Sequence, residues 1–395
     1  MSAHRVDLEL ADELKRYGAF DADACFNCGN CTAICRHAAE TDGFPRRLIR
    51  YGQLGMREKL LSAKETWLCW NCRDCSDTCP RQARPGEFME AARRYTIASM
   101  DPTGISRWMY SSSLFLVAFA IGLAALFAGV LLSGSETVEA DRLDLFGFIP
   151  FHLIHDVGVA VMALLGLLAL VSTGRLVRHL SRVMVPTAQG TDSAPNTEGS
   201  LAARVFAAAR AVLDEMAAHR RFRDCEVDRG QPAYLRPWFV HYSMMWGFIG
   251  LALATALDFL FKVPGSEVPL WHPARMLGTL AGLFLMYGTS VTIARWLRPV
   301  ERVDSRRLAS DWLFLGLLFL VGLSGFILEV LVYLPSVGSA GYAVFLVHVV
   351  LAMELLVLLP FTKFAHALYR PLAFGIFRFR AAQQGAPVAG LSPAE

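Results

Sequence analysis

The chain has 395 residues, of which 54% are hydrophobic and 18% are charged, and its mean hydropathy is +0.38. This composition is too apolar for a soluble protein and indicates membrane-spanning segments, while the length allows two or three domains. The formal net charge of +3 is too small to indicate nucleic-acid binding, so we expect no nucleic-acid partner.

The N-terminal residues up to Phe20 mix acidic side chains with leucines. This pattern predicts an amphipathic helix and argues against a signal peptide, which needs an uninterrupted apolar stretch. We therefore expect this end of the chain to stay in the cytoplasm, where thiols remain reduced and available for cluster assembly.

Eight of the nine cysteines form two runs with the same spacing. The first run reads Cys-x-x-Cys-x-x-Cys-x-x-x-Cys over residues 25–35, and the second repeats it over residues 69–79, where Pro80 follows. Thiolates bind iron well, and in two-cluster ferredoxins the fourth cysteine of each run ligates the other cluster. This rule predicts two [4Fe–4S] clusters, one on Cys25, Cys28, Cys31 and Cys79, and the other on Cys69, Cys72, Cys75 and Cys35.

Two other interpretations of these cysteines are weaker. Structural zinc uses Cys-x-x-Cys pairs but seldom a doubled four-cysteine run, and disulfides would need an oxidising compartment. The ninth cysteine, Cys225, is most simply a free thiol or a packing residue.

Two helices are predicted around the cysteine runs. One covers residues 44–55 with Pro45 near its first turn, and the other runs from Gly86 to about Ala98. Over about residues 10–100 the chain also resembles the C subunit of heterodisulfide reductases. The motifs that carry this resemblance are Pro45-Arg46, Gln53-Leu54-Gly55, Trp67-Leu68-Cys69 and Cys79-Pro80-Arg81.

From Trp108 onward, six apolar runs are each long enough to cross roughly 30 Å of hydrocarbon. They have no polar face, which argues against helices of a soluble core. The six runs are 108–132, 151–174, 238–261, 274–297, 312–334 and 341–368.

We therefore predict a mostly α protein, in which a small α-helical two-[4Fe–4S] ferredoxin-like domain precedes a six-helix transmembrane bundle. The predicted parts are a cluster domain (1–100), the first two transmembrane helices (101–180), a cytoplasmic loop with an amphipathic helix (181–237), four cytochrome b-like transmembrane helices (238–370) and a cytoplasmic tail (371–395).

Arginines cluster before the first apolar run and after the second, fourth and sixth, whereas the loop after the first run is acidic. Because arginine-rich loops stay on the cytoplasmic side, all basic clusters share the side of the cysteine domain. This predicts a multi-pass protein of the cytoplasmic (inner) membrane with both termini and the iron–sulfur domain in the cytoplasm. The arginines are Arg107, Arg175, Arg178, Arg182, Arg295, Arg298, Arg302, Arg306, Arg307, Arg370, Arg378 and Arg380.

The long loop between the second and third runs contains two kinds of sequence. Residues 186–200 are rich in Thr, Gly, Ser and Asn, which is typical of a linker. Residues 201–221 look helical, with apolar side chains along one face: Val205, Ala208, Val212 and Met216. Such a helix lies on the membrane surface, docks a partner protein or is simply solvated.

Histidine inside a membrane span is costly unless it is used or paired, and it is a common axial ligand of haem. His348 and His366 are 18 residues apart in the sixth run, which is five whole helical turns, so both project from one face about 27 Å apart. Pro360 between them can bend the helix. This spacing predicts two stacked b haems.

The inner haem is predicted to bind His241 and His366, which lie toward the cytoplasmic side. The outer haem is predicted to bind His348, with His155 as the preferred partner and His152 or His272 as alternatives. A competing interpretation is that these histidines only pair helices or form interfacial hydrogen bonds. The remaining histidines, predicted to be solvated and not ligating, are His4, His37, His179 and His219.

A set of polar residues falls toward the outer ends of the apolar runs and forms a candidate quinone site, although such residues are often only solvated. They are His152, His155, Asp258, Arg275 and Glu329. Glu354 lies deeper and is a weaker candidate for a proton path.

The membrane half resembles the gamma subunit of respiratory nitrate reductase and the cytochrome b subunit of heterodisulfide reductase. His348, His366 and Phe239-Val240-His241 carry the resemblance, but the family's second histidine on the partner span is replaced by Leu251. The fusion of the two halves resembles the C subunit of the quinone-interacting membrane-bound oxidoreductase family. The segment His219-Arg220-Arg221-Phe222 with Cys225 adds to this likeness.

This resemblance implies menaquinone in the membrane, flavin- and iron–sulfur-containing cytoplasmic partner subunits and, through them, adenylylsulfate reductase in sulfate respiration. The chain has no Gly-x-Gly-x-x-Gly turn, phosphate loop or Cys-Cys-Gly repeat, so the cytoplasmic substrate is expected to be handled by other subunits. Two alternatives stay open: a membrane component of a heterodisulfide-reductase-like or sulfite-reduction complex, and a redox-sensing membrane anchor without catalytic activity.

Overall fold

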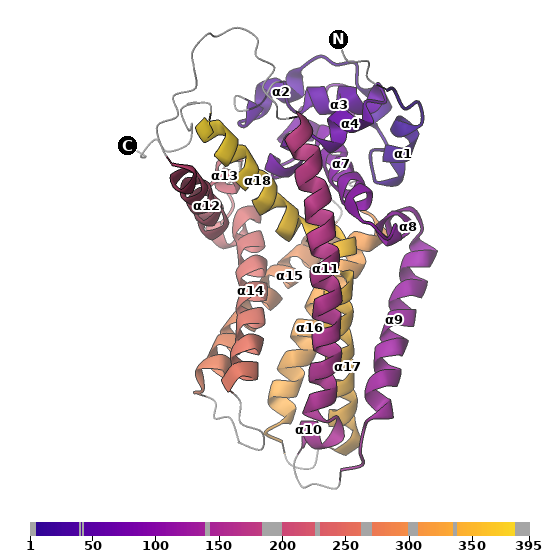
Figure 1. Ribbon diagram of the computed structural model, residues 1–395, viewed down its shortest axis with the longest axis vertical. Helices are drawn as coiled ribbons and strands as arrows, with labels where there is room; N and C mark the ends of the chain where they lie inside the picture. Colours follow the sequence, from indigo (N-terminus) through magenta and orange to yellow (C-terminus); the bar gives the residue numbers. More distant parts are fainter. Residues whose placement is uncertain are drawn as a thin grey trace.

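The computed structural model describes residues 5–38, 41, 43–138, 143–183, 200–225, 230–261, 271–298, 307–334 and 338–383. Within these ranges every regular element is helical, which confirms the predicted mostly α class. Figure 1 shows a cluster of short helices above a set of long, roughly parallel ones. The predicted linker over residues 186–199, together with His4, Arg302 and Arg306, lies outside the described residues.

The cluster domain is made of short helices packed around one long one. The predicted helices over residues 44–55 and 86–98 are confirmed as α3 and α7, and the N-terminal amphipathic helix is limited to α1. The elements are α1 (Leu10–Arg16), η1 (Ala22–Ala24), α2 (Asn30–Ile34), α3 (Arg46–Gln53), α4 (Arg57–Leu61), α5 (Glu65–Leu68), α6 (Asp74–Asp77) and α7 (Pro85–Met100).

Helix α7 forms the centre of this domain, and nearly all of its side chains are buried. Its Phe88 packs closely against Gly52 of α3, where a Cβ would collide with the ring. Gly55, with a φ of +67°, ends the following turn against the backbone of Asp7. Only glycine adopts that conformation at such a close approach without strain, which explains the Gln53-Leu54-Gly55 motif.

Below the cluster domain, six of the described helices are long and apolar enough to cross a membrane. They expose many large apolar side chains; Leu114, for example, is 81% exposed. The six helices are α9 (Ser113–Ser133), α11 (Phe151–Val183), α14 (Pro237–Phe261), α15 (Pro273–Leu297), α16 (Ala309–Leu331) and α17 (Gly338–Leu358). A short helix, α10 (Leu145–Phe148), precedes α11.

The first predicted span, 108–132, begins too early. Trp108 belongs to a separate helix, α8 (Ile105–Ser111). The extended backbone of Ser112 then interrupts the helical conformation before α9 starts. The Ser112 hydroxyl accepts a hydrogen bond from the Phe115 amide at 3.1 Å. It therefore caps α9, as serine does at helix N-termini.

The sixth predicted span, 341–368, is not one helix, so the expectation that His348 and His366 share one helical face is wrong. Helix α17 ends at Leu358, and two 3-10 turns, η4 (Leu359–Phe361) and η5 (Lys363–Ala365), follow. A new helix, α18 (His366–Gln383), then leaves at an angle, as Figure 1 shows. The physical reason is Pro360, which lacks the amide hydrogen that a continuous helix needs.

Helix α18 joins the two halves. It packs against α5 and α11, and against α12 (Leu201–Ala218) of the long loop. The loop continues as α13 (Arg220–Cys225) and the turn η3 (Ala233–Leu235). The predicted helix over residues 201–221 therefore exists but ends at Ala218, and it packs on α18 with its Ala208 buried and its Val205 exposed.

A buried ion network fixes the cluster domain on the bundle. Arg94 of α7 contacts Asp311 of α16 at 2.5 Å, and both side chains are 3% exposed. Arg94 also bonds Glu90 at 3.0 Å, and Glu90 lies 3.7 Å from Lys363 in η5. Although burial opposes ionisation, Lys363 and Arg94 lower the pKa of Glu90 far below its usual range.

Candidate functional site

The two cysteine runs adopt matching loops. In each run the residue before the second cysteine has a positive φ, Asn27 at 66° and Asn71 at 57°, and so does the residue after it, Gly29 at 90° and Arg73 at 70°. Asparagine and glycine tolerate this left-handed conformation best. The same backbone twist therefore presents the thiols in both runs, although only the second run ends in proline.

The thiols are grouped across the two runs. Burial raises the pKa of Cys31, and the other three thiols predicted for the first cluster raise it further. Burial also raises the pKa of Cys35 to about 11, but its interacting thiols come from the second run. The neighbours of Cys31 are Cys25, Cys28 and Cys79, and those of Cys35 are Cys69 and Cys72. This grouping agrees with the crossed ligand sets expected from the two-cluster rule, and the assignment of each thiol to a cluster stays a prediction.

Side chains from neighbouring helices hold the cysteine loops by their backbones. Gln53 of α3 donates to the carbonyls of Ala22 and Cys25 at 3.0 and 2.9 Å. Arg93 of α7 donates to the carbonyl of Cys69 at 2.7 Å. Each run is thus tied to a different helix of the domain, and the chemistry of the eight thiols fits two iron–sulfur clusters.

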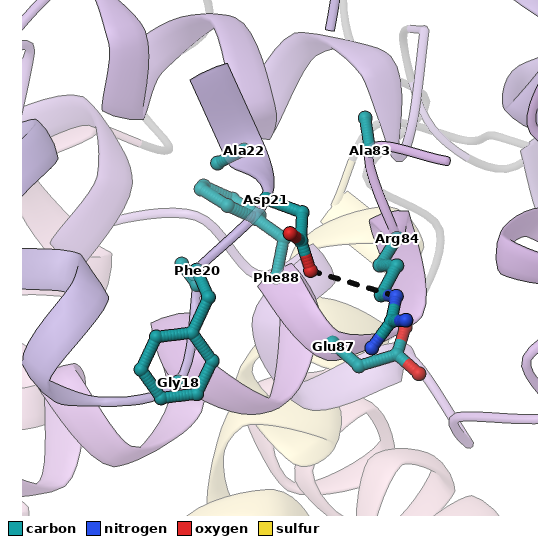
Figure 2. A pocket seen from close by; sticks show the side chains of 9 residues that line it. Gly18, Phe20, Asp21, Ala22, Ala83, Arg84, Glu87 and Phe88 are labelled. Atoms are coloured by element: carbon teal, nitrogen blue, oxygen red, sulfur yellow. Dashed lines mark ion pairs between the residues drawn. The ribbon is translucent and has the colours of Figure 1, made fainter. Parts of the chain in front are cut away.

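Two hollows lie on the cluster domain. The one in Figure 2, between η1 and α7, has a volume of about 10 Å³, room for about one water molecule, and the ion pair of Asp21 and Arg84 at 3.5 Å crosses it. The other is an open groove of about 480 Å³ beside Asn27. Four cationic side chains line the groove: Arg46, Arg47, Arg50 and Lys59.

The predicted inner-haem histidines lie close together. His241 is in the first turns of α14 and His366 begins α18, and their ring centroids are 6.1 Å apart. Two imidazoles on opposite sides of one metal ion, each with a nitrogen about 2 Å from it, have ring centres roughly 6 Å apart. The spacing of this pair therefore fits two histidines that would hold one haem iron between them.

The second ring nitrogen of each inner histidine has a partner. His366 Nδ1 donates to the carbonyl of Lys363 at 2.6 Å, and His241 Nδ1 lies 3.1 Å from Nε2 of His219. Metal-binding histidines characteristically engage their other nitrogen in this way, which fixes ring orientation. In both rings Nε2 is the nitrogen left for the candidate iron position.

His219 and His37 were expected to be solvated, and this expectation is wrong. Their exposures are 1% and 8%. His37 Nε2 contacts the carbonyl of Arg221 at 3.4 Å, and His219 Nδ1 contacts that of Met216 at 3.0 Å. Burial, helped by Arg370, lowers the pKa of His219 to about 4. The cause is that α13 folds back under the cluster domain, which hydropathy does not reveal.

Trp70, which the sequence reasoning missed, connects the second cysteine run to the histidines. It follows Cys69 directly, and its ring stacks on Phe222 with centroids 4.9 Å apart. The ring centroids of Trp70 and His241 are 6.0 Å apart in an edge-to-face arrangement. The guanidinium carbon of Arg370 lies 3.2 Å from the centroid of the Trp70 ring. An aromatic residue between two predicted cluster ligands was the available signal.

Cys225 also lies closer to the clusters than expected. Its buried thiol interacts with the thiol of Cys72, a predicted ligand of the second cluster. The same segment contributes the carbonyl of Asp224, which accepts from Arg36 at 2.7 Å. The interpretation of Cys225 as a simple packing residue therefore leaves out its contact with the second cysteine run.

The residues predicted for the outer haem lie on two helices, α11 and α17, and directly before a third, α15. His348 of α17 contacts the hydroxyl of Ser324 on α16 at 2.9 Å. His155 of α11 contacts Asp156 at 2.8 Å and stacks against Phe151. His152 is exposed in the first turn of α11, and His272 precedes α15 as a helix-entry residue. Which of these three pairs with His348 stays a prediction.

Three of the five candidate quinone residues come together. Arg275 of α15 bonds Glu329 of α16 at 2.7 Å, interacts with Asp258 of α14 and lies 4.8 Å from the ring centroid of Tyr333. Tyr333 was not among the predicted residues. The two histidines of the set, His152 and His155, lie on a different helix, α11, and Glu354 is buried on α17.

Comparison with known proteins identifies the N-terminal part first. The family of 4Fe-4S dicluster domains matches residues 21–83. The chain is 30% identical over 88 residues to the C subunit of the H(2):CoB-CoM heterodisulfide,ferredoxin reductase of Methanothermobacter thermautotrophicus, which covers 22% of this chain and 48% of that protein. It is 33% identical over 125 residues to a protein of Archaeoglobus profundus that is named as similar to the C subunit of heterodisulfide reductase. That match covers 29% of this chain and 66% of the relative.

A third relative belongs to another type of subunit. The chain is 28% identical over 153 residues to the E subunit of the dihydromethanophenazine:CoB--CoM heterodisulfide reductase of Methanosarcina mazei, covering 34% of this chain and 58% of that protein. The matches thus span about half to two thirds of these relatives. No solved structure matches the chain.

Fold and motif together define the class, an iron–sulfur redox protein with a dicluster domain and helices that can cross a membrane. Within that class, the chain is similar to the C and E subunits of heterodisulfide reductases, which are components of larger complexes.

Proposed function

We propose that this chain is a membrane electron-transfer subunit that relays electrons between the menaquinone pool and cytoplasmic partner subunits through two [4Fe–4S] clusters and two b haems. The observation that carries the proposal is the position of Trp70. It lies between two predicted cluster ligands, and its ring meets His241, whose own ring is 6.1 Å from that of His366.

When bound, the clusters and haems supply centres that accept and release single electrons. The chain's residues hold and shield them. Gln53 and Arg93 fix the cysteine loops through backbone hydrogen bonds, and Trp70 with Phe222 fills the space toward the histidines with apolar atoms and excludes water. Arg94 and Asp311 keep the cluster domain in one position on the bundle.

Quinone chemistry needs groups that exchange protons. The Arg275–Glu329 pair with Tyr333 and Asp258 supplies such groups at the end of the bundle far from the cluster domain. We propose this cluster as the quinone site, with the outer haem on His348 and His155. The arginine distribution supports a cytoplasmic cluster domain in the inner membrane.

The partner subunits are proposed to be flavin- and iron–sulfur-containing proteins with an acidic docking face. The groove of Arg46, Arg47, Arg50 and Lys59 lies next to the loop of Cys28, the most exposed predicted ligand. Opposite charges steer association at such surfaces. The resemblance to quinone-interacting membrane-bound oxidoreductases points to adenylylsulfate reductase as the final partner in sulfate respiration.

A second candidate function is supported by the names of the relatives, which are subunits of heterodisulfide reductases. In this alternative the chain serves a heterodisulfide-reductase-like or sulfite-reduction complex with the same internal relay. A third, a redox-sensing anchor, needs no quinone chemistry.

The test is purification of the full chain from its native membrane with its bound subunits. We expect about eight irons in clusters per chain, four for each, b-type absorption bands after dithionite reduction, and reduction of those bands by a menaquinol analogue. Absence of b-type bands contradicts the electron relay. If the bands are present but are not reduced by the quinol, the proposed quinone chemistry is wrong and the redox-sensing anchor is favoured. The co-purified subunits decide between the first two functions.

A further inference from the structure

Three histidines meet at the junction of the two halves. His219 ends α12, His241 lies in α14 and His366 begins α18. The ring centroids of His219 and His241 are 5.2 Å apart, and those of His241 and His366 are 6.1 Å apart. The proposed inner haem uses only the last two, so the third histidine needs its own explanation.

The hydrogen bonds of His219 determine which of its nitrogens carries the proton. Nδ1 lies 3.0 Å from the carbonyl of Met216. A carbonyl oxygen can only accept, so Nδ1 must be the protonated nitrogen. A neutral imidazole has one N–H, and this ring is 1% exposed beside Trp70, which is covered by the guanidinium of Arg370. A second proton would add a buried cation next to an existing one. Nε2 of His219 is therefore an acceptor.

The tautomer of His241 follows from this. Its Nδ1 is 3.1 Å from Nε2 of His219. Because that nitrogen is an acceptor, Nδ1 of His241 carries its proton and donates it. The other nitrogen of His241, Nε2, is then unprotonated and has a free lone pair, which is the form that binds a metal ion.

The same logic applies to the other predicted ligands, with different acceptors. Nδ1 of His366 donates to the carbonyl of Lys363. The hydroxyl of Ser324 donates to the carbonyl of Leu320 at 2.7 Å and can accept from Nδ1 of His348. In His241 and His366 Nδ1 holds the proton and Nε2 keeps its lone pair, and the contact of His348 with Ser324 is compatible with the same tautomer. Only His241 depends on another side chain that can adopt two tautomers.

The position of His219 is fixed by its surroundings. Its φ of +48° is left-handed, and its amide donates to the carbonyl of Glu215 at 2.9 Å. The ring of His219 packs between the rings of Trp70 and Tyr242, with centroid distances of 5.2 Å and 5.7 Å. This support aims the ring at His241, so its hydrogen bond is directional.

We propose that His219 is a positioning residue for the inner haem. Its Nε2 accepts a hydrogen bond from the Nδ1–H group of His241 and so holds that ligand in its iron-binding tautomer. This inference rests on the proposed function, because it requires a haem on His241 and His366. A hydrogen bond at Nδ1 makes the ligand more basic and favours the oxidised iron. Loss of the acceptor therefore favours the reduced haem.

The test uses the full chain and two variants of one residue. His219→Gln keeps a side-chain acceptor, whereas His219→Phe keeps an aromatic ring against Trp70 and Tyr242 but has no acceptor. Redox titration of both haems, with electron paramagnetic resonance of the oxidised state, separates the inner from the outer signal. His179→Gln, which changes a histidine of α11 outside this cluster, is the control.

We expect His219→Phe to shift the inner haem toward its reduced form by about tenfold or to lose that haem, as outer-shell changes at metal sites typically do. A tenfold shift corresponds to about 59 mV for one electron. The outer haem and both clusters should be unchanged. His219→Gln should stay close to wild type, and the His179→Gln control should match it.

Identical behaviour of the Phe and Gln variants overturns the proposal, whether both keep the wild-type potential or both lose the inner haem. A wild-type protein without haem, or a His241→Ala variant that keeps both haems, overturns the proposed function itself. Intact cluster and outer-haem signals show in each case that the variant is folded.

Discussion

The cluster domain and the membrane bundle are both helical, but they are stabilised in opposite ways. In the cluster domain, large side chains such as Trp67 and Tyr95 point inward and are almost fully buried. In the bundle, large apolar side chains such as Leu114 point outward, where lipid takes the place of a core. The hydrophobic effect can therefore fold the first region in water, whereas the second depends on close contact between helices.

The two regions also build their sites differently. The cysteine loops are set by local sequence, because two short runs with left-handed residues at the same positions form the same shape twice. The histidine sites are assembled from residues far apart in the chain, such as His219 and His366. A local motif therefore specifies the cluster ligands, whereas the proposed haem sites depend on the packing of the whole molecule.

The largest effect is expected from a change in the cysteine runs. Replacing Cys75 with serine should remove the second cluster, about four irons per chain, and destabilise the domain, because metal binding and folding are coupled. Iron analysis and electron paramagnetic resonance measure this. Cys225→Ser is the matched control and should retain both clusters; loss of a cluster there would make Cys225 a ligand.

The junction between the regions should respond next. Arg94→Met leaves the carboxylate of Asp311 buried without its partner and removes one of the cations that surround Glu90. Breaking a buried pair costs about 3–5 kcal/mol, so the cluster domain should detach and become sensitive to protease. The measurement is the free energy of unfolding together with limited proteolysis.

A control and a rescue accompany this variant. Lys15→Ala breaks a largely exposed pair with Asp12 and should change the free energy of unfolding by no more than about 1 kcal/mol. The double variant Arg94→Met, Asp311→Leu removes both charges and should recover most of the loss. Equal stability of the single and double variants would contradict a specific ion pair.

Packing in the bundle should give a smaller effect. A Cβ at Gly247 would lie 2.5 Å from the amide nitrogen of Leu285, where α14 and α15 meet. Gly247→Val should therefore cost about 1–3 kcal/mol in unfolding free energy, and haem content should fall because α14 carries His241. Gly122→Val on α9 meets open space and should be tolerated; an equal loss would show that helix propensity alone is responsible.

The smallest effect is expected at the basic groove. Reversing Arg50 and Lys59 to glutamate should slow association with the co-purifying partner subunit by about tenfold at low salt, and less at high salt. Arg5 and Arg16, reversed together elsewhere on the domain, give the same net charge change. Equal slowing by both double variants would indicate general charge and no docking at the groove.

The fold could largely be predicted from the sequence because its determinants are local. Hydropathy located the six long apolar helices among the described residues, and cysteine spacing located the dicluster domain. The break at Pro360 was foreseen only as a bend, because hydropathy continues through it. The candidate site was less predictable, since His219 and Trp70 meet His241 only after α13 folds against the cluster domain.

Lys363 has two contacts whose consequence concerns the order of assembly. Its carbonyl orients His366, while its ammonium group lies 3.7 Å from Glu90 of α7. The segment that carries this proposed haem ligand is therefore held from one side by the cluster domain. During biogenesis, we expect the inner site to mature only after that domain has folded onto the inserted helices, so that haem is captured last.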